Sequence, residues 1–325
     1  MLQPFDLPLE QLRAYRPELT KRPDFDAFWS DTLAELARVP LQSERARMPY
    51  PVRGLTVYRV FYPGFNHARI EAYLALPDSD RPLPGIVQYH GYNWGSDHNL
   101  HDTVNLALKG YAVLQMLVRG QQGESVDNVV SPNGHVSGWM TKGIQDRETY
   151  YYRGVYMDAV RAIEVLQGMP EVDASRIAVV GGSQGGAITL AAAALSDAPK
   201  LALAEYPYLS NFDRAIDIAP DGPYGELNEY FRRYSSYPEI EAKARETLAY
   251  FDVMNLAPRV QCRTWVCVGL VDTITPPSTV FAAYNHLACE KEIAVYRYYG
   301  HEGIPGSIAP RLQLLMDVLQ DGDEV

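Results

Sequence analysis

The residue best suited to chemistry in this chain is a serine that stands between glycines. Ser183 lies in Gly181-Gly182-Ser183-Gln184-Gly185, behind the mostly apolar run 176–180 and ahead of the small and apolar run 186–195. The first run predicts a buried strand and the second a buried helix, which places the serine on a sharp turn between them. Glycines two positions before and after the serine leave room where strand and helix approach each other. This pattern indicates a nucleophile for acyl transfer, and the alternative is a glycine-rich turn without chemistry.

A serine hydroxyl is a weak nucleophile at neutral pH, so it needs a base and an anion that orients that base. Asp272 directly follows the apolar run 265–271, and His301 stands at the end of the next run, 293–299. Both runs predict strands, and serine, acid, histidine is the chain order in which α/β-hydrolases carry these groups. The spacing therefore predicts a catalytic triad of Ser183, Asp272 and His301.

The acid and the histidine each have a structural alternative. Asp272 could cap the helix predicted at 276–287, and His301 could be an ordinary loop histidine. Asp213 and Asp252 are rival acids, but both lie in a segment that interrupts the alternation of strands and helices. We favour the triad because Asp272 and His301 each occur where the other requires a partner.

Acyl transfer also needs hydrogen-bond donors for the oxygen that becomes negative. One predicted donor is the backbone N–H of Gln184, the residue after the nucleophile. The other is the backbone N–H of Tyr92, in the loop after the strand predicted at 85–90. We expect His90 to hold the shape of this loop rather than to act as a second base.

Bulky side chains are expected around the nucleophile. Tyr92, Tyr206 and Pro207 are the predicted substrate contacts, and Tyr208 continues the run after the strand predicted at 201–206. A pocket with this much bulk leaves room for a short acyl chain and clashes with additional methylenes. The sequence therefore favours acetate esters as substrates.

Two further polar features favour structural interpretations. A cluster of carboxylate and imidazole groups precedes a helix predicted to begin near Thr103, and comprises Asp97, His98, His101 and Asp102. Asp and His often cap helices at such positions, so we expect neither a metal nor another cofactor. Arg119 ends a strand on the loop side of the sheet, where a buried ion pair is favoured over contact with substrate.

These residues require a scaffold of alternating strands and helices. Strands are predicted at 56–62, 68–76, 85–90, 111–118, 176–181, 201–206, 264–270 and 293–299, and helices at 149–167, 183–195, 276–287 and 307–320. The alternation predicts a mostly parallel twisted sheet with helices on both faces, the α/β-hydrolase fold. We expect one domain over 1–325, with an N-terminal helical extension (about 1–50) and a helical insertion (about 207–258) between the sixth and seventh strands.

Composition excludes several classes of partner. A net charge of -11 argues against nucleic acid and against an anionic membrane surface, because both are bound by clustered Lys and Arg. Phe25, Phe28, Trp29, Leu33 and Leu36 recur at helical spacing and predict a core-facing stripe. The N-terminal residues lack the pattern of a signal peptide, and three cysteines without metal-site spacing predict free, buried thiols in a reducing compartment. We therefore expect a soluble cytoplasmic protein.

Three ordered motifs resemble the signature of carbohydrate esterase family 7. They are Arg119-Gly120-Gln121, Gly181-Gly182-Ser183-Gln184-Gly185 and His301-Glu302. Residues 5–9, 150–156 and 273–286 are also similar to stretches of this family. After His301-Glu302 this chain has Gly303-Ile304-Pro305 where family members have an aromatic residue, so the resemblance leaves the triad intact but does not define the pocket beside it.

The resemblance implies a cytoplasmic acetyl xylan esterase and cephalosporin C deacetylase. Such enzymes act on acetylated xylo-oligosaccharides as homohexamers, trimers of dimers with active sites facing an internal cavity. The resemblance also implies the same triad of Ser183, Asp272 and His301, with the amides of Tyr92 and Gln184 as the oxyanion hole.

Other functions remain open on the sequence alone. A broad-specificity short-chain carboxylesterase or a lipase is harder to exclude from the sequence. A serine peptidase of the prolyl-oligopeptidase type shares fold and triad, but about 80 residues before the first parallel strand are too few for its propeller. A non-catalytic binding protein with this fold usually lacks a triad member.

Overall fold

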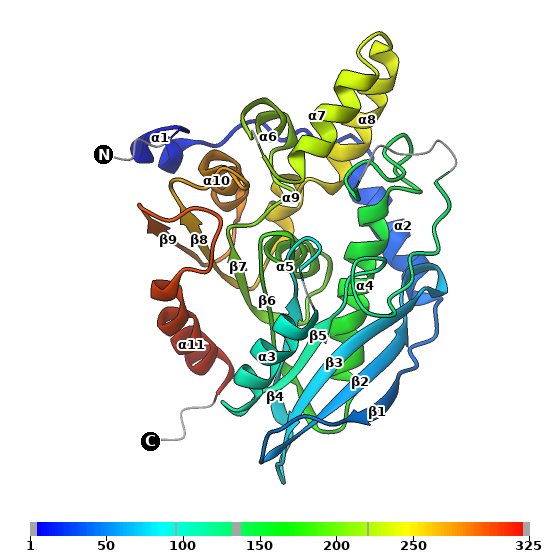
Figure 1. The fold of residues 1–325 in the computed structure, drawn as a ribbon, viewed down its shortest axis with the longest axis vertical. Coiled ribbons are helices and arrows are strands. Elements are labelled where there is room, and N and C mark those ends of the chain that lie inside the picture. The colour runs from blue at the N-terminus through cyan, green and yellow to red at the C-terminus, as the bar shows by residue number, and fades with distance from the viewer. Residues whose placement is uncertain (1–4, 95, 132–137, 220, 321–325) are drawn as a thin grey trace.

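The fold is known from a computed structural model in which residues 5–94, 96–131, 138–219 and 221–320 are described, except for the side chains of 96–99. The described residues contain one nine-stranded sheet in the order β1-β2-β3-β5-β4-β6-β7-β8-β9 (Figure 1). Its strands are Glu44–Met48 (β1), Leu55–Pro63 (β2), Arg69–Pro77 (β3), Leu83–Tyr89 (β4), Ala112–Met116 (β5), Val172–Gly182 (β6), Pro199–Glu205 (β7), Arg263–Gly269 (β8) and Lys291–Tyr296 (β9). β1 to β3 pair antiparallel and β4 to β9 run parallel, which confirms the predicted mostly parallel sheet and the α/β-hydrolase fold.

A hydrophobic core covers each face of the sheet because successive residues of a strand point to opposite sides. In β8, Val266 and Val268 face one core, whereas Trp265 and Cys267 face the other. The first core is covered by α2 (Phe25–Ala37), α4 (Tyr151–Gln167), α5 (Gln184–Leu195) and α10 (Pro277–His286). The second is covered by α3 (Ser96–Ala107) and α11 (Pro305–Leu319) (Figure 1).

The helix α5 behind the serine is buried along its whole length. Every residue of Gln184–Leu195 is buried, and most of them are glycine or alanine. Small side chains allow the helix axis to approach the sheet closely, which brings its first turn against the ends of the strands. The N-terminal stripe is also confirmed as core-facing, since Phe25, Phe28, Trp29 and Leu36 are buried in α2.

Several element boundaries differ from the prediction. β1 is a strand within the N-terminal extension (about 1–50) that was expected to be helical. It was not predicted, because its residues Glu-Arg-Ala-Arg-Met are almost all exposed and show no alternation. It is an edge strand, where charged side chains discourage pairing with other chains. α3 begins at Ser96 and not near Thr103, and β9 ends at Tyr296, so His301 lies on a loop beyond it. The short helix α1 (Leu9–Ala14), which contacts α10, lies in the N-terminal extension that was expected to be helical, although its bounds were not predicted.

The segment between β7 and β8 is helical. It contains α6 (Phe212–Ile218), α7 (Tyr224–Arg233), α8 (Pro238–Phe251) and α9 (Val253–Leu256). α7 and α8 reach furthest from the sheet, at the top of Figure 1. β1 shifts the strand count by one, so this segment connects the seventh and eighth strands and not the sixth and seventh.

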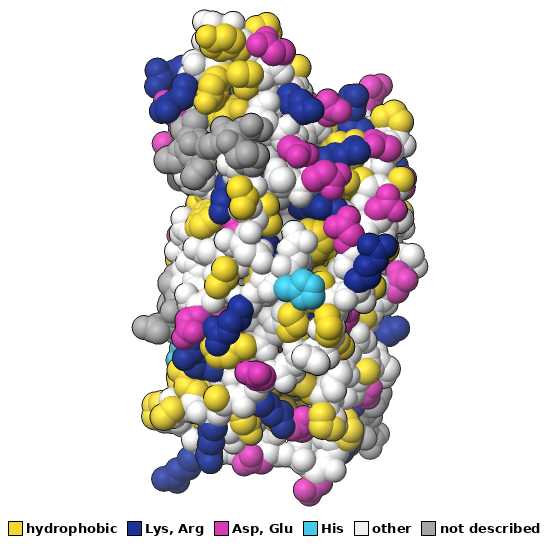
Figure 2. Space-filling model, turned by 90° about the vertical axis from the view of Figure 1, so that its right-hand side faces the viewer, with side chains coloured by type: hydrophobic (Ala, Val, Ile, Leu, Met, Phe, Trp, Pro, Cys, Tyr) yellow, Lys and Arg dark blue, Asp and Glu magenta, His cyan; other side chains and the backbone are white. Residues whose placement is uncertain are grey.

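The surface seen in Figure 2 carries basic and acidic side chains intermingled, without a field of one sign. In the part of the chain that the structure describes, no helix combines the length and the apolar character needed to cross a bilayer.

Sheet order brings the predicted site together. β4 and β6 are hydrogen-bonded neighbours, with Tyr89 opposite Gly181, so the loop after β4 lies beside the turn that carries Ser183. β5 lies on one side of β4 and β6 on the other. The carboxyl ends of these strands are therefore the switch point, the place where ligands bind in open α/β sheets. β7, β8 and β9 follow β6 in order, so the loops after β8 and β9 lie at the same carboxyl end of the parallel strands.

Candidate active site

Ser183 stands on a strained turn between β6 and α5. Its backbone has φ 57° and ψ -120°, a conformation that costs a non-glycine residue energy. A Cβ on Gly181 would lie 2.5 Å from backbone atoms of Gly185, and a Cβ on Gly185 would lie 2.1 Å from the carbonyl oxygen of Tyr89. Both glycines are therefore required by close backbone approach, as the sequence predicted. The Ser183 N–H donates to the carbonyl of Glu205 at 2.9 Å, which fixes the turn on β7.

The structure brings Ser183, His301 and Asp272 into one chain of hydrogen bonds. His301 Nε2 lies 2.9 Å from Ser183 Oγ, and His301 Nδ1 lies 2.9 Å from Asp272 Oδ2. An ionised carboxylate can only accept, so Nδ1 carries the proton and Nε2 accepts from the serine hydroxyl. This is the tautomer that a general base needs in order to take the serine proton.

The carboxylate of Asp272 is completely buried and fully hydrogen-bonded. Oδ1 accepts from the backbone N–H groups of Ile274 at 2.8 Å and Thr275 at 2.9 Å. The Thr275 hydroxyl donates to Oδ2 at 2.7 Å, the same oxygen that faces His301. Asp272 therefore has one permitted orientation. Thr275 was not singled out from the sequence, because its role depends on the turn after β8.

The two rival acids lie elsewhere. Asp252 is buried and accepts from the backbone N–H groups of Asn211, Phe212 and Met254 at 2.8 to 3.0 Å, which caps α9 and holds the segment before α6. Burial raises the pKa of the Asp252 carboxyl to about 6. Asp213 is more than half exposed and pairs with Arg245. Neither contacts His301.

The two residues predicted to supply the oxyanion donors lie on segments that meet at the turn of Ser183. Gln184 is the first residue of α5, so its N–H has no partner in a preceding helical turn. The loop after β4 that carries Tyr92 closely approaches the turn of Ser183 between β6 and α5 (the elbow), since a Cβ on Gly91 would lie 3.9 Å from the carbonyl oxygen of Gly182. This places the backbone of both residues beside Ser183.

A pair of glutamine side chains joins the elbow to this loop. Gln121 and Gln184 exchange amide hydrogen bonds of 2.8 and 3.0 Å. Gln121 Oε1 also accepts from the backbone N–H of Asn93 at 3.0 Å, and Gln184 Oε1 accepts from the Tyr152 hydroxyl at 3.0 Å. The Gln184 side chain thus ties together the two segments whose backbone amides are the predicted oxyanion donors. The motif containing Gln121 was visible in the sequence, but this contact was not.

His90 holds the loop and does not face the serine. Its Nε2 accepts from the backbone N–H of Val118 at 2.9 Å, so its Nδ1 carries the proton and donates to the carbonyl of Gly91 at 2.7 Å. Burial lowers the pKa of His90 to about 4, which keeps the ring neutral. His90 therefore links the end of β4 to the end of β5.

A tyrosine ring packs on the histidine, and the residues that follow it after β7 lie beside the serine turn. The Tyr206 ring packs edge-on against the His301 ring at 5.0 Å, and its hydroxyl lies over Gly182. Pro207 is buried against the first turn of α5, next to Gly186. The Tyr208 N–H donates to the Ser183 carbonyl at 3.0 Å. Two residues after His301, a Cβ on Gly303 would meet no atom within 4 Å.

Arg119 has the structural role that the sequence favours. Its guanidinium is fully buried, donates to both oxygens of Asp158 at 2.7 and 2.8 Å, and reaches the carbonyl of Phe65 at 3.1 Å. Asp97 and His98 of the polar cluster lie outside the residues whose side chains are described. Among the described residues, no group of three His, Cys, Asp or Glu side chains is arranged to hold a metal.

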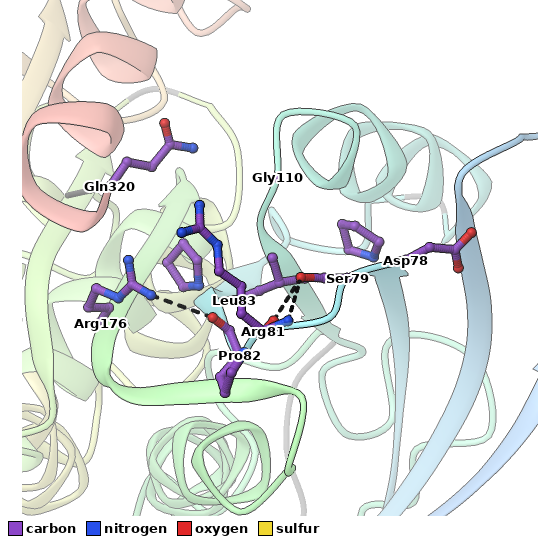
Figure 3. A pocket seen from close by; sticks show the side chains of 10 residues that line it. Asp78, Ser79, Arg81, Pro82, Leu83, Gly110, Arg176 and Gln320 are labelled. Atoms are coloured by element: carbon purple, nitrogen blue, oxygen red, sulfur yellow. Dashed lines mark hydrogen bonds between the residues drawn. The ribbon is translucent and has the colours of Figure 1, made fainter. Parts of the chain in front are cut away.

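A cavity of about 380 Å³ lies at the opposite edge of the sheet (Figure 3). It is formed where β3 ends and β4 begins, and its wall includes Arg81, Pro82, Arg176 and Gln320. Arg176 spans it and donates to the carbonyl of Pro82 at 3.5 Å. Because the strand ends that carry Ser183 and His301 are at the other edge, this cavity is separate from the candidate site.

A serine on a strand-to-helix turn, with an acid and a histidine after later parallel strands, defines this protein as an α/β-hydrolase with a Ser-His-Asp constellation. A family model described as acetyl xylan esterase matches residues 2–315. The chain therefore belongs to the acetyl xylan esterase family, a family of carboxylic ester hydrolases, which confirms the resemblance of its motifs.

Solved structures and a curated relative agree with this assignment. The acetyl xylan esterase from Paenibacillus sp. R4 is 42% identical, with a TM-score of 0.91 over 96% of this chain and 100% of that one. Acetyl xylan esterase 1 from Thermoanaerobacterium sp. JW/SL YS485 is 34% identical, with a TM-score of 0.92 over 97% and 99% of the two chains. Acetyl esterase Axe7A of Xylanibacter ruminicola is 29% identical over 86% of this chain, which spans 64% of that relative.

Proposed function

We propose that this chain is a serine esterase that removes acetyl groups from acetylated xylo-oligosaccharides and from related small acetate esters, including cephalosporin C. The observation that carries the proposal is the relay from Ser183 through His301 to Asp272, with both distances at 2.9 Å. Membership of the acetyl xylan esterase family supports acetate as the acyl group and a sugar hydroxyl as the leaving group.

In the proposed reaction, Ser183 Oγ attacks the acetyl carbonyl carbon while its proton moves to His301 Nε2. Asp272 stabilises the imidazolium that forms, and the backbone N–H groups of Tyr92 and Gln184 donate to the negative carbonyl oxygen. The tetrahedral intermediate collapses as His301 gives its proton to the sugar oxygen, which leaves as an alcohol. The acetyl group is then bonded to Ser183 Oγ.

Water completes the cycle by the same route. His301 takes a proton from the water as its oxygen attacks the acetyl carbon, and the second intermediate collapses to acetate. The proton on His301 returns to Ser183 Oγ. No cofactor is needed, because each proton has a donor and an acceptor within the relay.

We expect selectivity for acetate because bulky residues lie on and next to the side chains that react. Tyr206 packs on His301, and Tyr92 and Pro207 lie on the segments next to the serine. A pocket with such walls disfavours each additional methylene of the acyl chain by about 1–3 kcal/mol. An open apolar pocket would instead bind the substrate more tightly with each one.

An acyl-chain series with the purified enzyme tests the proposal. We expect kcat/KM to fall from acetyl through propionyl to butyryl p-nitrophenyl esters, and Ser183→Ala to remove all turnover while the protein stays folded. A rise of kcat/KM along the series would instead support a broad-specificity short-chain carboxylesterase. Retained turnover in Ser183→Ala would overturn the serine mechanism for either substrate class.

We further propose a cytoplasmic homohexamer, a trimer of dimers, as the family resemblance implies. The three cysteines are free, which suits a reducing compartment, although only Cys267 is buried and the expectation of burial was wrong for Cys262 and Cys289. Light scattering should give about six times the chain mass of 36.4 kDa. A stable monomer that deacetylates polymeric xylan as fast as its short fragments would contradict an enclosed assembly.

A further inference from the structure

We propose that Glu226, in the inserted segment, is a positioning residue that acts through the side chain of Tyr92. It holds the loop after β4 that carries Tyr92 (the oxyanion loop) against the serine. This rests on the proposed function, in which the Tyr92 amide is an oxyanion donor. Glu226 lies on α7 and Tyr92 follows β4, 134 residues apart in the sequence.

The carboxylate of Glu226 is the centre of a compact hydrogen-bonded group. The Tyr92 hydroxyl donates to Oε1 at 2.7 Å, and the backbone N–H of Met140 donates to Oε2 at 2.9 Å. The Tyr92 oxygen in turn accepts from the backbone N–H of Trp139 at 2.7 Å. Three segments thus meet at this carboxylate: α7, the stretch around 139–140, and the oxyanion loop.

The fit around this group is tight. A Cβ on Gly138 would lie 2.0 Å from the Glu226 carboxylate, so the backbone there wraps directly over it. Burial raises the pKa of Glu226 and raises the pKa of the Tyr92 hydroxyl well above its ordinary value. A desolvated carboxylate with short donors is held strongly, because removing one partner leaves the others unpaired in a medium of low dielectric constant.

The Tyr92 ring connects this group to the reacting serine. It packs edge-on against the Tyr208 ring at 6.5 Å, and the Tyr208 N–H donates to the Ser183 carbonyl. The tip of the Tyr92 side chain is fixed by α7, and its backbone belongs to the loop that faces the elbow. Loss of the anchor at the tip therefore frees the loop to move away from the position that an oxyanion donor must occupy.

A displacement of this kind affects the transition state more than substrate binding, because the donor acts on charge that exists only there. Misplacement by about 1 Å can cost up to 100-fold in rate, and partial loosening of one of two donors should cost about tenfold. A merely structural Glu226 would instead lower the stability and leave the kcat of the folded protein unchanged.

The test compares Glu226→Ala, Glu226→Gln and Tyr92→Phe with the double variant Tyr92→Phe/Glu226→Ala, using p-nitrophenyl acetate. We expect kcat to fall about tenfold in both Glu226→Ala and Tyr92→Phe, with KM within about twofold of wild type. The kcat of the double variant should be no lower than that of the less active single variant. Glu226→Gln keeps one acceptor oxygen and should fall between wild type and Glu226→Ala.

Glu229 provides the matched control, because it lies on the same helix and, among the described residues, forms its ion pairs with Arg232 and Arg233 on the surface. Glu229→Ala should leave kcat and KM unchanged. An unchanged kcat in folded Glu226→Ala or Glu226→Gln, or fully additive losses in the double variant, would overturn the proposal. Retained turnover in Ser183→Ala would be a separate result, because it would contradict the serine mechanism and not the anchoring of Tyr92.

Discussion

Replacement of Asp272 by asparagine should move the imidazole proton of His301 from Nδ1 to Nε2. In the wild type, two backbone N–H groups, those of Ile274 and Thr275, point at Oδ1. An asparagine must place its only oxygen there, since its NH₂ group would otherwise face two donors. The NH₂ group then occupies the Oδ2 position and donates to His301 Nδ1. The imidazole is forced to carry its proton on Nε2, facing Ser183.

The expected loss follows from this tautomer. With Nε2 protonated, His301 cannot accept the proton of Ser183 Oγ, although all heavy atoms keep their places. A wrong tautomer in a serine triad costs on the order of 10⁴ in kcat, which corresponds to about 5 kcal/mol in the activation free energy. KM should change little, because substrate binding does not involve this proton.

The assay is the initial rate of p-nitrophenyl acetate hydrolysis, with circular dichroism as the check of folding. Asp252→Asn is the matched control, because Asp252 is also buried and hydrogen-bonded but caps α9. It should lower the free energy of unfolding by about 1–3 kcal/mol while kcat of the folded protein stays unchanged. Folded Asp272→Asn with kcat within tenfold of wild type would refute the reasoning and exclude Asp272 from the triad.

Two further predictions concern the scaffold. His90→Gln should remove part of the acid sensitivity of folding. The pKa of His90 is about 4 in the folded protein and about 6.5 in the unfolded chain, so the unfolded state binds more protons between these pH values. The free energy of unfolding therefore decreases as pH falls through this window, by up to about 3 kcal/mol. Urea unfolding at pH 7 and pH 4.5 should show a smaller difference for His90→Gln than for wild type, and an equal difference would contradict a neutral buried imidazole. Gly185→Ala should prevent soluble expression or lower the free energy of unfolding by more than about 4 kcal/mol, because its Cβ would lie 2.1 Å from the Tyr89 carbonyl oxygen. Gly225→Ala, where a Cβ meets no atom within 4 Å, is the control, and equal stabilities of the two variants would contradict the packing argument.

The parts of the fold and site that sequence could predict are those governed by local constraints or by chain order. Ser183 was found because a strained turn between strand and helix admits few residues besides glycine around it. Asp272 and His301 were found because they follow strands in the order that the chemistry requires. The buried strands were found because their apolar runs are long and continuous.

The parts that sequence could not predict depend on contacts between distant segments. β1 has charged residues and no alternation, so its strand conformation comes only from pairing with β2. Gln121 and Glu226 look like ordinary polar residues, and their contacts with Gln184 and Tyr92 arise only when loops from separate strands and the insertion meet. Asp252 has the burial of a catalytic acid, and only its three backbone donors show that it is a cap.

Isolation of the acetylated enzyme is the measurement that tests the central claim most directly. p-Nitrophenyl acetate has an activated leaving group, so acylation is fast and the acetyl-enzyme should accumulate during turnover. Acid quenching followed by peptide mass spectrometry should locate a mass increase of about 42 Da, one acetyl group, on Ser183 and nowhere else. The same experiment on Ser183→Ala should show no acetylated peptide and no turnover. An acetyl group on another residue, or turnover by Ser183→Ala, would contradict the account.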